Sequence, residues 1–438
     1  MKKRKDSILK PFLVVLCVMI MVGVVALNTN SSGEENGAYL ATVDQQGSLV
    51  SSGDPEVTKP AVQSGISNLF EQEKVSASPV PTAEPTVAPI VVPTKTPEPV
   101  TTKVTLAAVG DDLIHSQIYK SAKKSNGSYN FDQLFLNLKD EIASPDIAVI
   151  NQETVLGGAS LGYSGYPRFN SPTEVGDAVV KAGFDVVLHA TNHAMDKGEK
   201  GMQNTIDFWK KYPEITVLGA NESQDEADTI PVVDVNGIRI AMLNYTYGLN
   251  GLSLPSGRTY MVNLLDEQRV RSDVAKAKEI SDFVIVFPHW GTEYVYKPVE
   301  SQKEWTQIFL ETGVDLVIGT HPHVLESVEW IEREDGHRML VYYSLGNFVS
   351  SQSEVPRMLG GMANVTIEKT GEEKAVIADA SITPLVTHIT KGSKEFTVYK
   401  LSEYTDSLAA KHRLSGKGLN IKKLKSLSKQ ILGDWYTE

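Results

Sequence analysis

Apolar runs of strand length alternate with segments of helical spacing from about residue 103 to residue 325, and this pattern restricts the fold more than any other feature. Such alternation is typical of an α/β domain with mostly buried strands. A hairpin is also expected around Asn236-Gly237, and later strands predict that the sheets end in antiparallel pairs. The expected strands begin at 103 and cover 146–153, 185–193, 230–247, 282–290, 314–318, 338–349, 362–385 and 395–401, and the expected helices cover 131–142, 172–184, 202–212, 265–280 and 301–313.

The chain before this alternation has two parts of different composition. The basic stretch "MKKRK" precedes an apolar run at 11–27, which predicts a membrane anchor at residues 1–27 or, in second place, a cleaved signal peptide. Either places the remainder outside the cytoplasm, in a single-pass protein of the cell membrane or in a secreted one. Residues 28–102 are rich in proline, serine and threonine and are expected to form a disordered linker.

The rest of the chain is expected to form a domain over 103–401 and a basic tail over 402–438. Within the tail, 421–432 has apolar residues at helical spacing between lysines, which predicts a short helix packing on the domain or a loosely ordered segment; contact with anionic lipid or polymer is a further alternative. The formal net charge of −12 argues against nucleic acid as the main partner. Cys17 is the only cysteine, so no intramolecular disulfide forms.

Polar residues follow the carboxyl ends of the expected strands. They occur in loops that leave successive apolar runs, and in open α/β sheets this edge is where sites are built. If the strands are parallel, these residues converge on one crevice. They are Asp111, Glu153, Asn192, His193, His289, His321 and His323.

These residue types predict a metal site. Carboxylate, amide and imidazole groups together suit divalent ions such as Mn, Fe or Zn. The set exceeds the ligands of a single catalytic metal, which typically holds about three protein groups and a water, but it suffices for two divalent metals roughly 3.5–4 Å apart. In His321-Pro322-His323 the proline limits backbone freedom, so the two imidazoles can address different metals.

Six short motifs resemble the bacterial CapA family of capsule and poly-γ-glutamate biosynthesis. They are "GDDLIH", "INQETVL", "ATNHAMDKG", "FPHWGTEY", "GTHPHVLESVE" and "YSLGNFV", and the resemblance covers about 105–385. The CapA family is similar to calcineurin-like metallophosphoesterases. The resemblance therefore implies a metallophosphoesterase-like two-sheet sandwich flanked by helices.

The resemblance also implies roles for the polar residues. Asp111 and His323 would bind the first metal; Asn192, His289 and His321 would bind the second; Glu153 would bridge the two. His193 would be the catalytic acid. The sequence departs from the pattern because Asp112 follows Asp111 where an Asp-x-His motif is usual, and because the bridge is Glu153 rather than aspartate. His115 is the nearest histidine that could replace the missing ligand. At position 191, Thr stands where the family usually has Asn.

Four further residues each have a functional and a structural interpretation. His115 is a ligand or a turn histidine, and Asp196 orients His193 or caps the helix after Gly198. Glu293 accepts a hydrogen bond from a ligand or binds substrate, or it is a solvated loop carboxylate. Arg168 is a clamp for a carboxylate or an exposed loop arginine. The Gly346-Asn347 pair is expected to make a tight structural turn.

Two functions remain open. The first is a membrane-anchored, extracytoplasmic enzyme dependent on two metals, either a phosphoesterase-like hydrolase or a γ-glutamyl amide hydrolase or transferase. The second is a non-catalytic membrane-anchored subunit that binds polymer or partners during export. The expected partners are the cytoplasmic membrane, an anionic polymer such as poly-γ-glutamate, and other membrane subunits of a capsule synthesis complex.

Overall fold

The structure, a computed structural model, describes residues 99–437. The expected anchor at 1–27 and most of the expected linker lie outside these residues. Strand β1 (Thr101–Asp112) includes the last residues assigned to the linker. Within the described part, no helix has both the length and the apolar character needed to cross a membrane.

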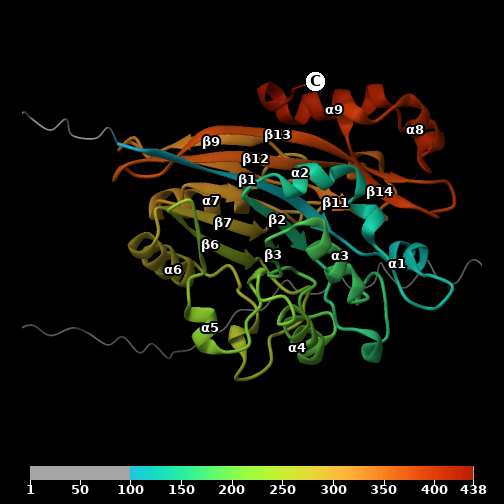
Figure 1. The fold of residues 1–438 in the computed structure, drawn as a ribbon, viewed down its shortest axis with the longest axis horizontal. Coiled ribbons are helices and arrows are strands. Elements are labelled where there is room, and N and C mark those ends of the chain that lie inside the picture. The colour runs from blue at the N-terminus through green and yellow to red at the C-terminus, as the bar shows by residue number, and fades with distance from the viewer. Residues whose placement is uncertain (1–98, 438) are drawn as a thin grey trace, which may run out of the picture. The chain divides into compact units, whose positions relative to one another are not determined.

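Two mixed sheets form the framework (Figure 1). In the first sheet, β1 to β4 run parallel, and β12 to β14 extend it in antiparallel fashion; β11 runs parallel to the end of β1. Its order is β14-β13-β12-β1-β2-β3-β4. Besides β1 it comprises β2 (Ile147–Gln152), β3 (Val186–Leu188), β4 (Thr216–Leu218), β11 (Asn347–Val349), β12 (Leu359–Thr370), β13 (Val376–Ile389) and β14 (Phe396–Lys400).

The second sheet has four parallel central strands with an antiparallel strand at each edge. Its order is β5-β6-β7-β8-β10-β9. These strands are β5 (Val232–Val235), β6 (Ile238–Thr246), β7 (Phe283–His289), β8 (Leu316–Ile318), β9 (Val328–Glu332) and β10 (Arg338–Tyr342). The expected α/β class with two sheets is confirmed.

The main hydrophobic cluster takes residues from both sheets, for example Val149 from β2 and Ile285 from β7. A second cluster joins β6 and β7 to helices α6 and α7. The helices therefore cover the sheets, as expected for strands that are buried along their whole length. The helices are α1 (Ser116–Ala122), α2 (Lys139–Ala143), α3 (Glu174–Ala182), α4 (Gly198–Trp209), α5 (Gln224–Asp228), α6 (Glu267–Ile280), α7 (Glu300–Thr312), α8 (Asp406–Lys411) and α9 (Ile421–Leu432).

The helix expected over 131–142 is wrong in detail. The segment forms two short 3₁₀ turns, Asp132–Leu134 and Leu136–Leu138, before α2 begins. The Asn137 side chain donates to Thr397 Oγ1 and to the Val398 carbonyl, at 3.0 and 3.1 Å. These bonds attach the segment to β14, and a tertiary contact of this kind overrides a weak local helix preference.

The strand expected over 338–349 is divided between the two sheets. β10 lies in the second sheet, whereas β11 lies beside the end of β1 in the first, with Asn347 in register with Asp111. The chain crosses close to β1, because a Cβ built on Gly110 would lie only 1.9 Å from the carbonyl oxygen of Gly346. Glycine is thus required at position 110, where two backbones approach closely.

The C-terminal segment at 402–438 contains helices α8 and α9. In α9, Leu424 and Leu432 are buried and belong to the main hydrophobic cluster, and the Asn420 side chain accepts a hydrogen bond from the backbone N–H of Lys423. An asparagine at this position caps the helix start. α8 and α9 lie over the side of the first sheet formed by β12 and β13 (Figure 1).

Candidate metal centre

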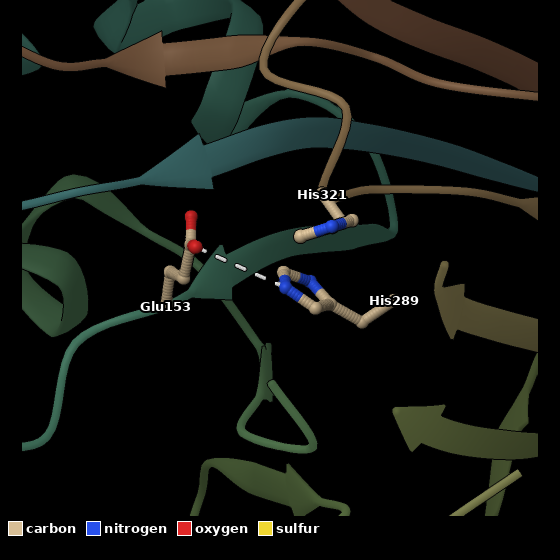
Figure 2. Close-up of side chains that lie close together, drawn as sticks. All are labelled: Glu153, His289 and His321. Atoms are coloured by element: carbon tan, nitrogen blue, oxygen red, sulfur yellow. Dashed lines mark ion pairs between the residues drawn. The ribbon is translucent and has the colours of Figure 1, made fainter. Parts of the chain in front are cut away.

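The polar residues predicted from strand ends come from both sheets and meet in one place. Asp111 ends β1, and Glu153 follows β2 in the first sheet, whereas His289 ends β7, and His321 follows β8 in the second. All four side chains are buried. In Figure 2 the Glu153 carboxylate and the His289 ring face each other, with His321 beside them. The site therefore lies where the carboxyl ends of the parallel strands of the two sheets meet.

Two overlapping groups have the spacing of metal ligands. One contains Asp111, Glu153 and His323, and the other contains Glu153, His289 and His321; within each group the donor atoms lie within 4.8 Å of one another. Glu153 is the member that both groups share. Its Oε1 lies 3.6 Å from His323 Nε2 and 3.8 Å from His289 Nε2. Glu153 thus lies between the two groups.

Neighbouring side chains fix the direction of the imidazoles. His323 Nδ1 lies 3.0 Å from Asp111 Oδ2 and 3.1 Å from Asn347 Oδ1, which leaves Nε2 toward Glu153. His289 Nδ1 lies 3.0 Å from Thr320 Oγ1. Such contacts on one ring nitrogen orient the other nitrogen of a metal-binding histidine.

Asn192 completes the second group from the loop after β3. Its Oδ1 lies 3.1 Å from His289 Nε2, and its amide donates to Asn250 Oδ1 at 3.3 Å. Thr191, which departs from the usual family residue, donates its hydroxyl to the Glu153 carbonyl at 2.9 Å. The loops after β2 and β3 are therefore linked directly.

The His-Pro-His loop has an unusual backbone. His321 and His323 have φ angles of +97° and +58°, which non-glycine residues rarely adopt. Their rings are 5.8 Å apart, centroid to centroid. Strained backbone of this kind often marks functional sites, where the surrounding structure holds it in place. The strain allows both imidazoles of the short loop to face the same centre.

The electrostatics of the centre fit a bound cation. Burial raises the pKa of Glu153 well above its usual range, and neither of its carboxylate oxygens has a hydrogen-bond partner. His321 Nδ1 is also buried without a partner. Orphaned buried polar atoms are costly, and a divalent cation would satisfy all three. Carboxylate and imidazole donors together suit such an ion.

The histidines differ in their charge environment. Burial lowers the pKa of His289 and of His321, and the neighbouring histidines lower it further. Burial alone would also lower the pKa of His323, but the Glu153 and Asp111 carboxylates raise it to about 9. The two carboxylates therefore act on His323 more strongly than its burial does.

His193 lies beside the centre in an arrangement that suits proton transfer. Its Nδ1 is 2.7 Å from Asp196 Oδ2, and its ring meets the Phe169 ring edge to face at 4.7 Å. Asp196 also accepts from the backbone N–H of Phe169 at 2.6 Å. Asp196 therefore contacts His193, whereas the start of α4 receives no side-chain cap from the residue that precedes it.

Arg168 extends the same set of contacts. Its Nη1 lies 3.8 Å from Asp196 Oδ1, and the side chain is 45% exposed. The guanidinium is therefore near the pair formed by His193 and Asp196 and is also accessible from solvent. This placement is compatible with binding of an anionic substrate group.

Two other histidines have structural surroundings. His115 Nδ1 lies 3.1 Å from the Leu113 carbonyl and accepts from the Ser351 N–H at 3.3 Å, and none of the ligand groups found within residues 99–437 includes it. His189 Nε2 accepts from the Trp209 indole at 2.6 Å. The structure therefore does not place His115 where it would replace the missing Asp-x-His ligand.

Glu293 is closer to the centre than its sequence context indicated. Its carboxylate forms a third group with His321 and His323, again within 4.8 Å. Unlike the other carboxylates of the centre it is only partly buried. Of the interpretations of Glu293, that of a solvated loop carboxylate agrees least with this position.

Sequence reasoning missed three polar residues that contact the predicted ligands. The Asn151 amide donates to Asp111 Oδ1 at 2.8 Å, and Thr320 and Asn347 contact His289 and His323 as described above. All three lie inside the quoted motifs "INQETVL", "GTHPHVLESVE" and "YSLGNFV". For Asn151 and Thr320 the available signal was a predicted ligand within two residues in the same motif, whereas the motif of Asn347 holds no predicted ligand.

Two similar proteins have names that refer to capsules or to PGA. The capsule biosynthesis protein CapA of Bacillus anthracis is 29% identical over 258 residues, covering 57% of this chain and 60% of that protein. The PGA biosynthesis protein CapA of Bacillus subtilis (strain 168) is 32% identical over 190 residues, covering 43% of this chain and 48% of that protein. The chain thus spans about half to three fifths of the length of these relatives.

Solved structures show only distant likeness. The NAD nucleotidase NadN of Haemophilus influenzae aligns with a TM-score of 0.40 at 13% identity, over 75% of this chain and 61% of that one. A 5'-nucleotidase precursor from Thermus thermophilus aligns with a TM-score of 0.39 at 15% identity, over 75% of this chain and 59% of that one. Likeness at this level carries no conclusion about fold or activity.

A family model covers the part of the chain that holds the centre. The model, described as bacterial capsule synthesis protein PGA_cap, matches residues 105–352, which include every predicted ligand from Asp111 to His323. Because this match takes in more than half of the chain, the protein belongs to the bacterial capsule synthesis protein PGA_cap family.

Proposed function

We propose that the protein is a hydrolase or transferase dependent on two divalent metals, acting outside the cytoplasm in capsule or poly-γ-glutamate biosynthesis or export. The observation that carries the proposal is the environment of Glu153. Both of its oxygens are buried without partners, and it belongs to both ligand groups. A carboxylate shared in this way is what a two-metal site requires.

The described residues would divide between two metal positions. Asp111, Glu153 and His323 would hold the first metal, and Glu153, Asn192, His289 and His321 would hold the second. The ions would be Mn, Fe or Zn, because mixed oxygen and nitrogen donors suit them. When bound, they would polarise the substrate oxygen and supply a hydroxide nucleophile near neutral pH.

His193 and Asp196 would contribute the proton. Asp196 Oδ2 lies 2.7 Å from His193 Nδ1, so the carboxylate orients the ring. His193 would then donate to the leaving group, while Arg168 would receive an anionic part of the substrate. The same set of residues would serve hydrolysis of a phosphoester, which gives a phosphate group and an alcohol, or of a γ-glutamyl amide, which gives a carboxylate and an amine.

The membrane and polymer relationships are further parts of this proposal. The basic and apolar N-terminal sequence supports a single-pass anchor with the C-terminal domain outside, and the names of the two CapA relatives support a role in capsule or PGA biosynthesis. The partners would be the cytoplasmic membrane, an anionic polymer such as poly-γ-glutamate, and other membrane subunits of a capsule synthesis complex.

Metal analysis of the full-length protein, purified without chelator, tests the proposal. We expect about two equivalents of divalent metal per chain, and a clear loss in the double variant His289→Ala, His321→Ala. His337→Ala is the matched control, because that imidazole lies outside all ligand groups of the described residues. Metal content in the double variant equal to wild type would contradict the proposal. Metal without turnover of any phosphoester or γ-glutamyl amide would favour a non-catalytic subunit.

A further inference from the structure

We propose that Glu293 is itself a metal ligand, on the partly exposed side of the centre, and that substrate displaces it. The inference rests on the proposed function, because it presupposes a metal centre. Neither the family match nor the relatives assign a role to this residue. It would be the exchangeable ligand of a centre whose other carboxylates, Asp111 and Glu153, are buried.

The loop that carries Glu293 is fastened to the His-Pro-His loop. The backbone N–H of Tyr294 donates to the Pro322 carbonyl at 2.8 Å, and the N–H of Trp290 donates to the Thr320 carbonyl at 3.1 Å. Tyr294 has a φ of +67°, so the loop is held in a conformation that a non-glycine residue seldom adopts. In the sequence Glu293 lies between Trp290 and Tyr294, so these two hydrogen bonds hold its loop against the His-Pro-His loop.

The Glu293 carboxylate lies at ligand distance from two imidazoles. One of its oxygens and one nitrogen each of His321 and His323 are within 4.8 Å of one another. His321 Nδ1 is buried and has no hydrogen-bond partner, so a donor there is available to a cation. The group therefore combines a carboxylate with two buried imidazoles, one of which has a nitrogen without a hydrogen-bond partner.

The charge of Glu293 affects the pKa of neighbouring groups. Burial is the main reason for the raised pKa of Glu153, and Glu293 is among the further carboxylates that raise it. Burial is also the main reason for the raised pKa of Tyr294, and the neighbouring Glu293 adds to it through its charge and a hydrogen bond. The carboxylate thus acts on the bridging residue, in keeping with its place beside His321 and His323.

The histidine ligand of the Asp-x-His pattern is missing from this sequence, and Glu293 can take its place as a ligand. In the Asp-x-His pattern of metallophosphoesterases the histidine stands two residues after the first aspartate; here that position is Leu113, and the His115 ring contacts Leu113 and Ser351 instead. Glu293 is the remaining acidic donor of the ligand groups within residues 99–437. Because it is partly exposed, water or a substrate anion can reach the position that it occupies.

A metal titration of the full-length protein tests the inference. Mn²⁺ is titrated by calorimetry into chelator-treated wild type, Glu293→Gln and Glu293→Asp, with Glu300→Gln as the control, since Glu300 is a largely exposed acid of the same region. We expect Glu293→Gln to weaken at least one Mn²⁺ equivalent about 10-fold or more, Glu293→Asp to weaken it less, and Glu300→Gln to match wild type. Equal unfolding midpoints in EDTA would show that the variants remain folded.

A second measurement separates a displaceable ligand from a mere neighbour. Inorganic phosphate is titrated into the Mn²⁺-saturated proteins, and we expect it to bind several-fold more tightly to Glu293→Gln, because an anionic competitor is gone. Mn²⁺ isotherms of Glu293→Gln that superimpose on wild type would overturn the inference and leave the proposed function standing. A wild-type protein that binds no Mn²⁺, Zn²⁺ or Fe²⁺ would overturn both.

Discussion

A buried carboxylate shortly after the His-Pro-His loop gives a prediction with a definite sign. Glu326, three residues after His323, is 0% exposed. Its Oε2 accepts from the Gln302 side chain at 2.6 Å, but its Oε1 has no hydrogen-bond partner. Burial raises the pKa of Glu326 from 4.5 to about 7, although the Gln302 hydrogen bond opposes the shift. The folded protein therefore prefers Glu326 protonated.

The magnitude follows from the two pKa values. The protonated form is retained by the folded state and lost by the unfolded chain between pH 4.5 and about 7, so stability falls as pH rises through this window. At about 1.4 kcal/mol per pKa unit, the loss above pH 7 amounts to at most about 3.5 kcal/mol. Below pH 4.5 this contribution to stability is fully present.

The variant Glu326→Gln removes the titration and retains an acceptor for Gln302. We expect it to unfold like wild type near pH 4.5 and to be more stable by about 1–3 kcal/mol at pH 8, after allowance for structural relaxation. The assay is urea unfolding of EDTA-treated protein across this pH range. Glu329→Gln is the control, because that carboxylate is exposed. A gap between variant and wild type that does not change with pH would refute the reasoning.

Three further outcomes are expected. His193→Gln should retain its metal by elemental analysis and lose about 10²–10⁴-fold in turnover of any substrate found, whereas loss of the metal would make His193 a ligand. The Arg357 guanidinium lies 3.5 Å from the Tyr294 ring centre and forms no ion pair with a carboxylate of the described chain. Arg357→Gln should therefore weaken poly-γ-glutamate binding, measured by thermophoresis, more than Arg357→Lys, and equal weakening would show that charge is not the cause. Arg413 donates to the Ser351 and Gln352 carbonyls at 2.7 and 2.6 Å. Arg413→Ala should lower the free energy of unfolding by about 1.5–3 kcal/mol, and an unchanged urea midpoint would contradict this.

Much of the fold could be predicted from local patterns. Strands such as β2 and β7 are buried along their whole length, so their apolar runs are continuous and easily recognised. The Asn236-Gly237 turn predicted the hairpin of β5 and β6, because this pair favours a tight turn with positive φ; both residues have positive φ. Short segments held by distant contacts were less predictable, and the 3₁₀ turns that Asn137 attaches to β14 are the example.

The candidate site was predicted in its residue types but not in its three-dimensional arrangement. The sequence by itself determined that Asp111, Glu153, His289, His321 and His323 each follow an apolar strand, because the end of such a run is visible locally. It also supplied the motifs that point to the family.

Only the tertiary structure decided which of these ends meet. Hydrophobic periodicity shows which residues are buried but does not show which sheet a strand joins. The segment 338–349 accordingly divides between two sheets, and Asn347 reaches His323 through a crossing that no local pattern reveals. The contact of the His321 N–H with Asp111 Oδ1, at 3.3 Å, joins residues 210 positions apart. Pairings at that separation depend on how two sheets pack, and this packing places Glu293 at the centre and His115 outside the ligand groups.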